Sequence, residues 1–322
     1  MVLITGSSSL TGKKLVNRLL KDGEKVRCLD FEKPRDFPEK AEFITGDVLD
    51  DDLLKKACSG VDTVFHFMDL KRSDKKGRRY MKKINITGTE KIIRASQKAG
   101  VKKFMFLSSY MIYGKTKAIP IRQDDRKKAA TRYGKQKLKA EKICWNNVPK
   151  QDMKITIFRP AVVVGPEVQD PMILITLFMA LGMDDANQVY VYGNGDTRFQ
   201  LLYPDDFISA LVSARERDIS AGKVYNLGSD NVPTQIEQMI KLKEIAKLDF
   251  TIKHLSPKYS KFLSIFFRPF RLNFLSPEHL NLLKNNIMLD CQRAKKDLDW
   301  QPTKDNMEIL KETIEWYKTD KL

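Results

Sequence analysis

The stretch that decides the fold is MVLITGSSSLTGKKLVNRLLK, residues 1–21. Its first five residues are typical of a buried strand, and the pattern of residues 13–21 is typical of a helix. Backbone amides at the start of a helix, together with the helix dipole, favour a bound pyrophosphate. We therefore expect a dinucleotide-binding turn between the two elements, with a tight turn at its start and close packing of helix on strand at its end. The candidate phosphate-binding residues are Gly6, Ser9, Leu10 and Gly12.

Strands and helices alternate through the first half of the chain. Buried parallel strands are indicated by apolar runs at residues 1–5, 25–29, 42–45, 62–67, 103–108 and 154–159. Helical patterns separate them near residues 11–22, 50–59, 79–99 and 131–147. Such alternation predicts an α/β fold of the Rossmann type, a doubly wound parallel sheet with helices on both faces.

The regularity of this pattern decreases after residue 160, and we infer two lobes built from interleaved segments. A dinucleotide-binding domain is expected at residues 1–160, joined by the strand–helix–strand pattern at residues 199–228. Residues 161–198 and 229–322 would form a smaller, mainly helical substrate-binding lobe. The cleft between the lobes is where we expect the ligands to bind.

The chain of 322 residues carries a formal net charge of +17, and its densest basic run is KRSDKKGRRYMKK at residues 71–83. No aromatic residues alternate with this run as a stacking platform for nucleic acid would need, so no nucleic-acid partner is expected. We interpret the lysines as a solvated surface, with a patch for an anionic ligand as the alternative.

Cysteines and histidines are few and scattered along the sequence. The four cysteines, at positions 28, 58, 144 and 291, form no C-x-x-C pair, and only three histidines are present. This spacing predicts reduced thiols in the cytoplasm and no metal site. No apolar run approaches the ~20 residues of a membrane span, so no membrane-spanning segment is expected. No apolar leader precedes the first strand pattern, so no secretory signal is expected.

Asp30 ends the second expected strand, about 20 residues beyond the glycine turn. A carboxylate at this point can bind the ribose hydroxyls of a dinucleotide, and it would repel the 2′-phosphate of NADP. NAD is therefore the expected cofactor. The alternative is that Asp30 only caps the turn that follows its strand.

Tyr133 and Lys137 are spaced i and i+4 on an expected helix, which places them on one face. A phenol with a pKa of about 10 is a poor base at neutral pH, but a nearby ammonium favours the phenolate. The strand at residues 103–108 ends in Ser108 and runs into Ser109, so it delivers a hydroxyl to the sheet edge where ligands of open α/β sheets bind. A serine hydroxyl at this strand end, Tyr133 and Lys137 are thus the candidate catalytic groups.

These features, in this order, resemble the NAD-dependent epimerase/dehydratase branch of the extended short-chain dehydrogenases/reductases, over essentially the whole chain. The glycine turn at residues 5–12 is similar to the family's T-G-x-x-G-x-x-G, and residues 85–89 (NITGT) are similar to its N-x-x-G-T segment. Ser109 begins a stretch that matches the family's S-x-x-x-Y-G. Three further matches are Asp290 and residues 294–302 with D…K-A-x-x-x-L-G-W-x-P, in which Asp299 replaces a glycine, and residues 315–317 with the closing helix.

The resemblance implies a role for each candidate. Tyr133 would be the general acid/base on a substrate hydroxyl or carbonyl, Lys137 would hold the nicotinamide ribose and keep Tyr133 acidic, and Ser109 would polarise the same oxygen. NAD would exchange a hydride with the adjoining carbon. Asp47 would contact the adenine, and the other expected cofactor contacts are Val48, Phe67 and Asn85.

Three residues depart from the family pattern close to the expected cofactor. Ser9 occupies the middle glycine of the turn, where backbone approaches phosphate, so we expect weaker or shifted binding. Met68 and Asp69 replace the two small residues of the family's H-x-A-A. Either the local backbone retreats, or cofactor affinity is reduced.

The expected substrate site departs from the family as well. Val162 takes the place of the asparagine that nucleotide-sugar epimerases use for the diphosphate, and Phe199 takes that of their arginine, with Arg198 next to it. The form R-P-x-x-x-x-G-P at residues 159–166 instead resembles the 3β-hydroxysteroid dehydrogenases. No acidic residue follows Ser109 directly, which argues against dehydration.

We therefore predict an NAD-dependent oxidoreductase or epimerase that transfers a hydride at a secondary alcohol or ketone, with a nucleotide sugar as the favoured substrate. One alternative is a 3β-hydroxysteroid dehydrogenase-like reductase of an apolar substrate. Another is a non-catalytic dinucleotide-binding regulator, which would not need the serine, tyrosine and lysine.

The family also implies a homodimer, with the helices at residues 79–99 and 131–147 paired across a two-fold axis. The aromatic stretch at residues 258–271 is the segment without an assigned role. It is interpreted as core of the smaller lobe, with a lid or a shallow contact with a membrane surface as alternatives.

Overall fold

A computed structural model gives the structure of the protein. It describes residues 1–70, 77–116, 119–147, 152–168, 188–245, 247, 249–256 and 284–320. Residues 169–187 of the expected smaller lobe, the aromatic stretch at 258–271 and the first six residues of the basic run at 71–83 lie outside these ranges.

The large lobe is built on a sheet of seven strands in the order β10-β6-β5-β4-β1-β2-β3. Every neighbouring pair is parallel. The strands are β1 (Val2–Thr5), β2 (Val26–Asp30), β3 (Glu42–Thr45), β4 (Thr63–His66), β5 (Lys103–Leu107), β6 (Lys154–Pro160) and β10 (Val224–Leu227). The chain reverses its direction of travel across the sheet between β1 and β4, which makes this a doubly wound sheet. The predicted fold class is confirmed.

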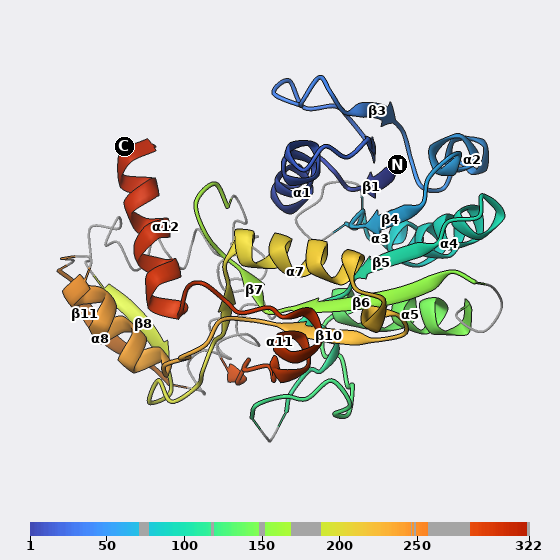
Figure 1. Cartoon of the computed structure of the whole chain (residues 1–322). Helices are drawn as coiled ribbons and strands as arrows, with labels where there is room; N and C mark the ends of the chain where they lie inside the picture. Colours follow the sequence, from blue (N-terminus) through green and yellow to red (C-terminus); the bar gives the residue numbers. More distant parts are fainter. Residues whose placement is uncertain are drawn as a thin grey trace.

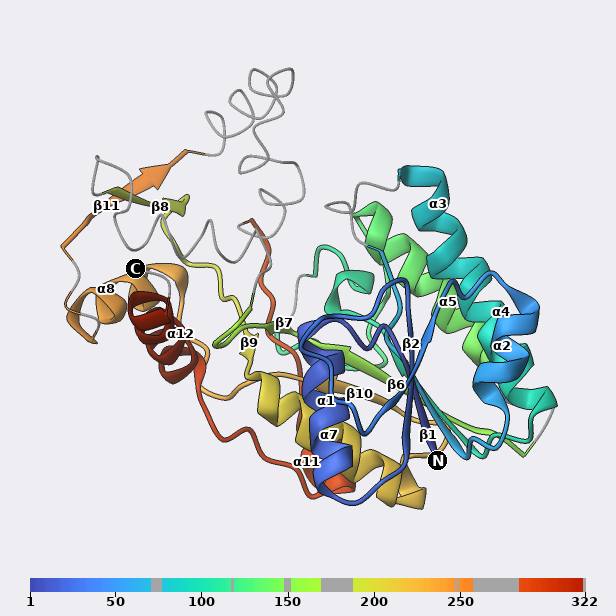
Figure 2. The ribbon, with the colours of Figure 1, turned by 90° about the horizontal axis from the view of Figure 1, so that it is seen from above.

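Helices cover both faces of the sheet (Figures 1 and 2). One face carries α1 (Leu10–Lys21), α7 (Pro204–Glu216) and α11 (Gln292–Leu298). The other carries α2 (Asp51–Cys58), α4 (Thr89–Lys98) and α5 (Arg132–Asn147), and α4 is preceded by α3 (Arg78–Lys82) and a π-helical turn at Lys83–Gly88.

Both faces of β1 are buried, which explains its uninterrupted apolar sequence. Val2 and Ile4 lie in the same core cluster as Leu15 of α1, whereas Leu3 lies in the cluster that contains Leu54 of α2. All of these side chains are fully buried. At about 25 cal/mol per Å² of apolar surface, burial of one such side chain contributes roughly 1.5–3 kcal/mol.

The smaller lobe has its own core. Two short parallel pairs, β7 (Val162–Val163) with β9 (Leu201–Leu202) and β8 (Gln188–Tyr192) with β11 (Thr251–Leu255), pack with α8 (Gln235–Ile245) and α12 (Asn306–Asp320). Val189, Leu242 and Leu310 are among the buried residues of this cluster. In the parts of the chain that the structure describes, no helix is both long and apolar enough to span a membrane.

One segment of the expected smaller lobe packs on the large lobe instead. Leu289, Leu298 and Trp300 lie in the same core cluster as Val2, and the indole Nε1 of Trp300 donates to the carbonyl oxygen of Asp206 in α7 at 2.8 Å. The division of the chain into lobes stays a prediction, and this packing favours placing residues 289–300 with the sheet.

Candidate active site

The turn between β1 and α1 is held by very close backbone packing. Gly6 has φ of +75°, and a Cβ on it would lie 2.5 Å from the backbone nitrogen of Met68. A Cβ on Gly12 would lie 2.5 Å from the carbonyl oxygen of Gly6. Both glycines are therefore required by the space around them, and the turn has the geometry of a phosphate cradle at a helix N-terminus.

Ser9 has a structural role at the position of the missing middle glycine. It is the N-cap of α1: its Oγ accepts from the Gly12 backbone N–H at 3.1 Å and donates to the Gly6 carbonyl oxygen at 2.8 Å. An N-cap serine stabilises a helix by about 1 kcal/mol. Leu10 follows as the first residue of α1 and is half-buried.

Asp30 connects the end of β2 to the glycine turn. Its Oδ2 accepts from the Ser8 backbone N–H and its Oδ1 from the Phe31 backbone N–H, each at 2.8 Å. The carboxylate thus caps its own turn and at the same time lies directly beside the phosphate cradle. The two interpretations of Asp30 are compatible in this geometry.

Asp47 and Val48 lie at the end of the neighbouring strand. Asp47 Oδ1 accepts from the Leu49 backbone N–H at 2.8 Å, and its Oδ2 accepts from the phenol of Tyr80. Val48 is fully buried and packs against Gly88 so closely that a Cβ on Gly88 would clash with the Val48 side chain. Burial and the Asp47 carboxylate raise the pKa of Tyr80 to about 12. The sequence analysis did not predict the part that Tyr80 plays here.

His66 lies at the end of β4 and is fully buried as a neutral ring. Its Nδ1 lies 2.7 Å from Thr5 Oγ1, and its Nε2 lies 3.1 Å from Thr89 Oγ1. Thr89 donates its own proton to the carbonyl oxygen of Asn85, so we assign the imidazole proton to Nε2. Burial, and then the charge of Lys137, lower the pKa of His66 to about 3.

This shift predicts how stability depends on pH. The unfolded chain binds a proton at His66 below a pH of about 6.5, whereas the folded protein does not until a pH of about 3. The contribution to stability is therefore fully present above pH 6.5 and decreases by about 1.4 kcal/mol per pH unit below it. We expect urea unfolding to show about 2 kcal/mol less stability at pH 5 than at pH 7 from this group. His66→Asn should be less sensitive to pH over this window; equal sensitivity in both proteins would contradict the assignment.

Tyr133 and Lys137 project from one face of α5, as their spacing predicts. The Lys137 Nζ lies 5.6 Å from the centre of the Tyr133 ring and donates to the carbonyl oxygen of Leu107, at the end of β5, at 2.7 Å. The lysine side chain is only 3% exposed. The pair thus lies at the carboxyl edge, the edge at which the parallel strands end.

Ser109 lies at the same edge, in the segment directly after β5. Its backbone is extended, and its Oγ accepts from the Met111 backbone N–H at 3.2 Å at the start of a 3₁₀ turn (Tyr110–Ile112). A Cβ on Gly134 of α5 would clash with the carbonyl oxygen of Met111. This close approach brings the segment that carries Ser109 against the helix that carries Tyr133.

A carboxylate lies between the tyrosine and the lysine. Asp69 Oδ2 accepts from the Tyr133 hydroxyl at 2.5 Å and lies 2.7 Å from Lys137 Nζ. The sequence identified Asp69 as a departure but did not predict this contact, because the residues are far apart in the chain.

Phe67 and Asn85 hold the chain on both sides of this carboxylate. The Phe67 backbone N–H donates to the carbonyl oxygen of Thr5 at 2.9 Å. The Asn85 side chain makes hydrogen bonds of 2.8 and 2.9 Å with the backbone of Leu70, and donates to Gln136 of α5 at 2.8 Å. Asn85 therefore connects the segment after β4 to α5, the helix that carries the candidate residues Tyr133 and Lys137.

Comparison with known proteins identifies the family of this site. A model of the NAD dependent epimerase/dehydratase family matches residues 2–228. The chain belongs to that family. Members are NAD-dependent enzymes, so NAD is the cofactor, and the alternative of a non-catalytic regulator is not retained. The glycine turn fits this cofactor, because it lies at the N-terminus of α1, where backbone amides and the helix dipole favour a pyrophosphate.

Relatives of this NAD dependent epimerase/dehydratase chain cover most of its length. "Uncharacterized protein y4nG" of Sinorhizobium fredii is 27% identical over 99% of this chain and 79% of that protein. The N-acetyl-alpha-D-glucosaminyl-diphospho-ditrans,octacis-undecaprenol 4-epimerase of Escherichia coli O157:H7 is 26% identical over 75% of this chain and 73% of that protein. The solved UDP-glucose 4-epimerase of Thermotoga maritima with UDP-glucose covers 98% of both chains at 24% identity, with a TM-score of 0.78. That last likeness shows the shared fold.

A buried ion pair joins α5, the helix that carries Tyr133 and Lys137, to β6 in this epimerase/dehydratase family member. Arg159 of β6 donates from Nε and Nη2 to the two carboxylate oxygens of Glu141 in α5, at 2.9 and 2.7 Å. Both side chains are at most 2% exposed. Ser108 donates to Glu141, and Tyr113 lies 2.8 Å from Arg159 Nη1 and donates to Asn226 of β10 at 2.7 Å. Burial raises the pKa of Tyr113 to about 12.

The residues that replace the family's diphosphate ligands lie in the smaller lobe. Val162 and Phe199 are half-buried against its core. Arg198 donates to the carbonyl oxygen of Val232 and lies 3.9 Å from Glu237 of α8. Its guanidinium is therefore paired within the smaller lobe.

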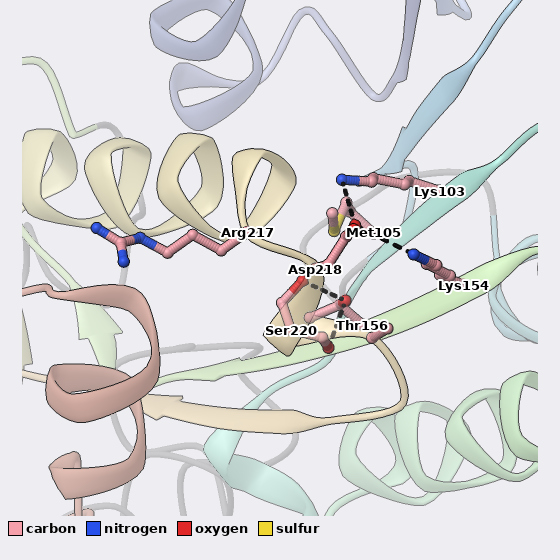
Figure 3. A pocket seen from close by; sticks show the side chains of 8 residues that line it. Lys103, Met105, Lys154, Thr156, Arg217, Asp218 and Ser220 are labelled. Carbon is pink, nitrogen blue, oxygen red and sulfur yellow. Dashed lines mark hydrogen bonds and ion pairs between the residues drawn. The ribbon is translucent and has the colours of Figure 1, made fainter.

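A surface hollow lined by charged side chains lies at the opposite edge of the sheet, where the strands begin (Figure 3). Lys103 and Lys154, the first residues of β5 and β6, lie 3.3 and 3.1 Å from the exposed carboxylate of Asp218. These two ammonium groups hold the pKa of Asp218 below its usual range. The hollow is remote from the candidate catalytic residues, which all lie at the carboxyl edge.

Proposed function

We propose that this enzyme transfers a hydride at a secondary alcohol or ketone of a sugar linked to a diphosphate, a nucleotide sugar foremost, and that it works as an epimerase. The observation that carries the proposal is the placement of Tyr133 and Lys137 on one helix face at the carboxyl edge of the sheet. That edge also holds the segment of Ser109 and the glycine cradle. Ligands of doubly wound sheets bind at this edge, beside the point where the strand order reverses.

Each candidate residue has a defined task in this proposal. The amides around Gly6, Ser9, Leu10 and Gly12 would hold the pyrophosphate, with Asp30 at the ribose. Asp47 and Val48 would line the adenine site, and Phe67 and Asn85 would shape the floor near the nicotinamide. When bound, NAD supplies the hydride acceptor. Tyr133 takes the proton of the substrate hydroxyl and returns it, Lys137 holds the ribose, and Ser109 donates a hydrogen bond to the same oxygen.

The substrate class is proposed from the relatives and from the smaller lobe. The relative from Escherichia coli carries in its name a sugar linked by diphosphate to a polyprenol, and the neighbour from Thermotoga maritima holds UDP-glucose. Val162 and Phe199 stand where nucleotide-sugar epimerases have diphosphate ligands, and these apolar side chains weaken the case for a nucleotide sugar. A 3β-hydroxysteroid dehydrogenase-like activity on an apolar alcohol is therefore the second candidate.

Two measurements test the proposed function. Mass spectrometry of the purified protein should find NAD retained, because an epimerase keeps its cofactor through the cycle. Incubation with UDP-sugars, polyprenyl diphosphate sugars and hydroxysteroids should then give epimer interconversion without net NADH. NADH accumulation with a hydroxysteroid would favour the second candidate, and no reaction with any of the three classes would contradict both.

Cofactor preference gives a further prediction. Asp30→Ala removes the carboxylate that would meet a 2′-phosphate, so NADP binding should strengthen and NAD binding should weaken, each by about tenfold or about 1.4 kcal/mol. Asp30→Asn is the matched control, because it removes the charge and keeps the size, and its one carbonyl oxygen can still accept from the backbone amide of Ser8 or of Phe31. Calorimetric titration measures both cofactors. Equal affinities of the wild-type protein for NAD and NADP would contradict the role of Asp30.

We further propose a cytoplasmic homodimer. The dimer would pair the segments at residues 79–99 and 131–147, whose helices α4 and α5 pack beside each other on one face of the sheet. Half-buried Ile143 and Trp145 on α5 would contribute apolar surface to such an interface. Light scattering at micromolar concentration distinguishes a dimer from a monomer. The cytoplasm is supported by the cysteines, which are all buried free thiols.

A further inference from the structure

Asp69 carries a feature that the proposed reaction does not use. Its Oδ2 lies 2.5 Å from the Tyr133 hydroxyl and 2.7 Å from Lys137 Nζ, so one oxygen bridges the general acid/base and the buried ammonium. The Asp69 side chain is 14% exposed and that of Lys137 is 3% exposed. At such burial an ion pair is little screened by solvent, and each partner depends on the other for its charge to be compensated.

The backbone that carries Asp69 is fixed on both sides. Before it, Met68 is 2% exposed, and its N–H donates to Thr5 Oγ1 at 3.3 Å. After it, Leu70 is clamped by Asn85, which also holds α5. The backbone at residues 67–68 touches the glycine turn so closely that Gly6 has no room for a Cβ. The chain therefore has not retreated to make room for the larger side chains; the carboxylate projects into the catalytic face instead.

The position of this carboxylate opposes the two tasks assigned to its neighbours. A lysine that holds ribose hydroxyls must offer them its N–H groups, but Asp69 Oδ2 and the Leu107 carbonyl oxygen already take two of the three. A phenol that serves as a base must give up its proton, but a carboxylate that accepts from it favours the neutral phenol. Asp69 Oδ2 therefore both occupies an N–H group of Lys137 and favours the protonated phenol of Tyr133.

We propose that Asp69 is an internal ligand of the Tyr133–Lys137 pair, and that the cofactor ribose must displace it from Lys137 when NAD binds. Without the cofactor, Asp69 compensates the buried ammonium and keeps the phenol protonated. Binding of NAD breaks the contact and frees both groups for catalysis. The cost of breaking it lowers the affinity for NAD. Because this inference rests on the proposed function, its test must separate the two.

Calorimetric titration with NAD of the wild-type protein and three variants, each freed beforehand of any NAD that co-purifies, provides that separation. Asp69→Ala, which restores a small residue, should bind NAD at least tenfold more tightly, and Asp69→Asn, which keeps the size but not the charge, should lie between it and the wild type. Asp218→Ala is the matched control: it removes a carboxylate paired with lysines at the far edge of the same sheet, and it should leave the affinity unchanged (Figure 3).

Thermal unfolding gives a second readout. Loss of Asp69 leaves the ammonium of Lys137 buried with less compensation, so Asp69→Ala should unfold at a lower temperature without NAD and gain more from NAD than the wild type does. If Asp69→Ala does not fold, Asp69→Asn decides the titration. NAD affinity in the Asp69 variants equal to or weaker than that of the wild type would overturn the internal-ligand proposal and leave the proposed function standing. Absence of NAD binding by all four proteins would overturn both.

Discussion

We expect Tyr133→Phe to lower turnover by roughly 10²–10⁴-fold, the usual contribution of a positioned proton transfer, while the protein still folds and binds NAD. In the proposed function the phenol exchanges a proton with the substrate, whereas its ring contributes only packing. Phe keeps the ring, and Lys137 keeps its contacts with Asp69 and the Leu107 carbonyl oxygen. The change therefore removes the phenol proton and the hydrogen bond that the hydroxyl donates to Asp69 Oδ2, and leaves the packing of the ring.

Two companion variants sharpen this prediction. Lys137→Ala should lower both turnover and NAD affinity, because the same ammonium is assigned to the ribose and to the phenol. Ser109→Ala should fall between, since it removes one hydrogen bond to the reacting oxygen. Rates are measured on the best substrate from the screen, and NAD affinity is measured by titration. Unchanged turnover in Tyr133→Phe would show that the central assignment is wrong.

Glu141→Ala should destabilise the protein by about 3–5 kcal/mol, the usual cost of removing one partner of a buried ion pair. The variant leaves the Arg159 guanidinium 1% exposed with its charge uncompensated, and Ser108 loses its acceptor. Glu90→Ala is the matched control, because Glu90 pairs with Arg94 at 2.6 Å on the exposed side of α4. Its loss should cost less than about 1 kcal/mol.

A double variant distinguishes charge from packing at this pair. Glu141→Leu with Arg159→Met removes both charges and should be less destabilised than either single variant, because no buried charge is left alone. Urea unfolding at pH 7 measures all of these proteins. A cost for Glu141→Ala as small as that for Glu90→Ala would contradict the account of a desolvated, mutually dependent pair.

The sheet could be predicted from the sequence because its strands are buried on both faces. A short apolar run such as that of β1 is typical of a strand buried on both faces. The turn that follows it contains glycines that the packing requires. The common face of Tyr133 and Lys137 followed from helix geometry alone. Strand burial and the helix face of a residue depend on neighbouring positions in the chain, so sequence patterns predict them.

The features that the sequence did not reveal depend on contacts between distant segments. The contact of Asp69 with Tyr133 spans 64 residues, and that of Tyr80 with Asp47 spans 33. The sequence analysis assigned the short helix α11 to the smaller lobe, but its Ala294 and Leu298 lie in the core cluster of the sheet, which favours the large lobe. A misfit can be noticed in a sequence, as Asp69 was, but its partner is set by the folded chain.

The place of β10 has a consequence for how the chain reaches its native state. This edge strand pairs with β6 only after the chain has passed through much of the smaller lobe, and the core that holds Val2 and Ile4 also requires Leu298 and Trp300. Contacts of such sequence separation form slowly. During synthesis, β6 therefore remains an unpaired edge strand, and the sheet face that Leu298 and Trp300 cover in the native protein remains exposed. Unpaired strand edges of this kind are prone to associate with other chains. We expect synthesis of the last third of the chain to be the step that commits this sheet to its native topology.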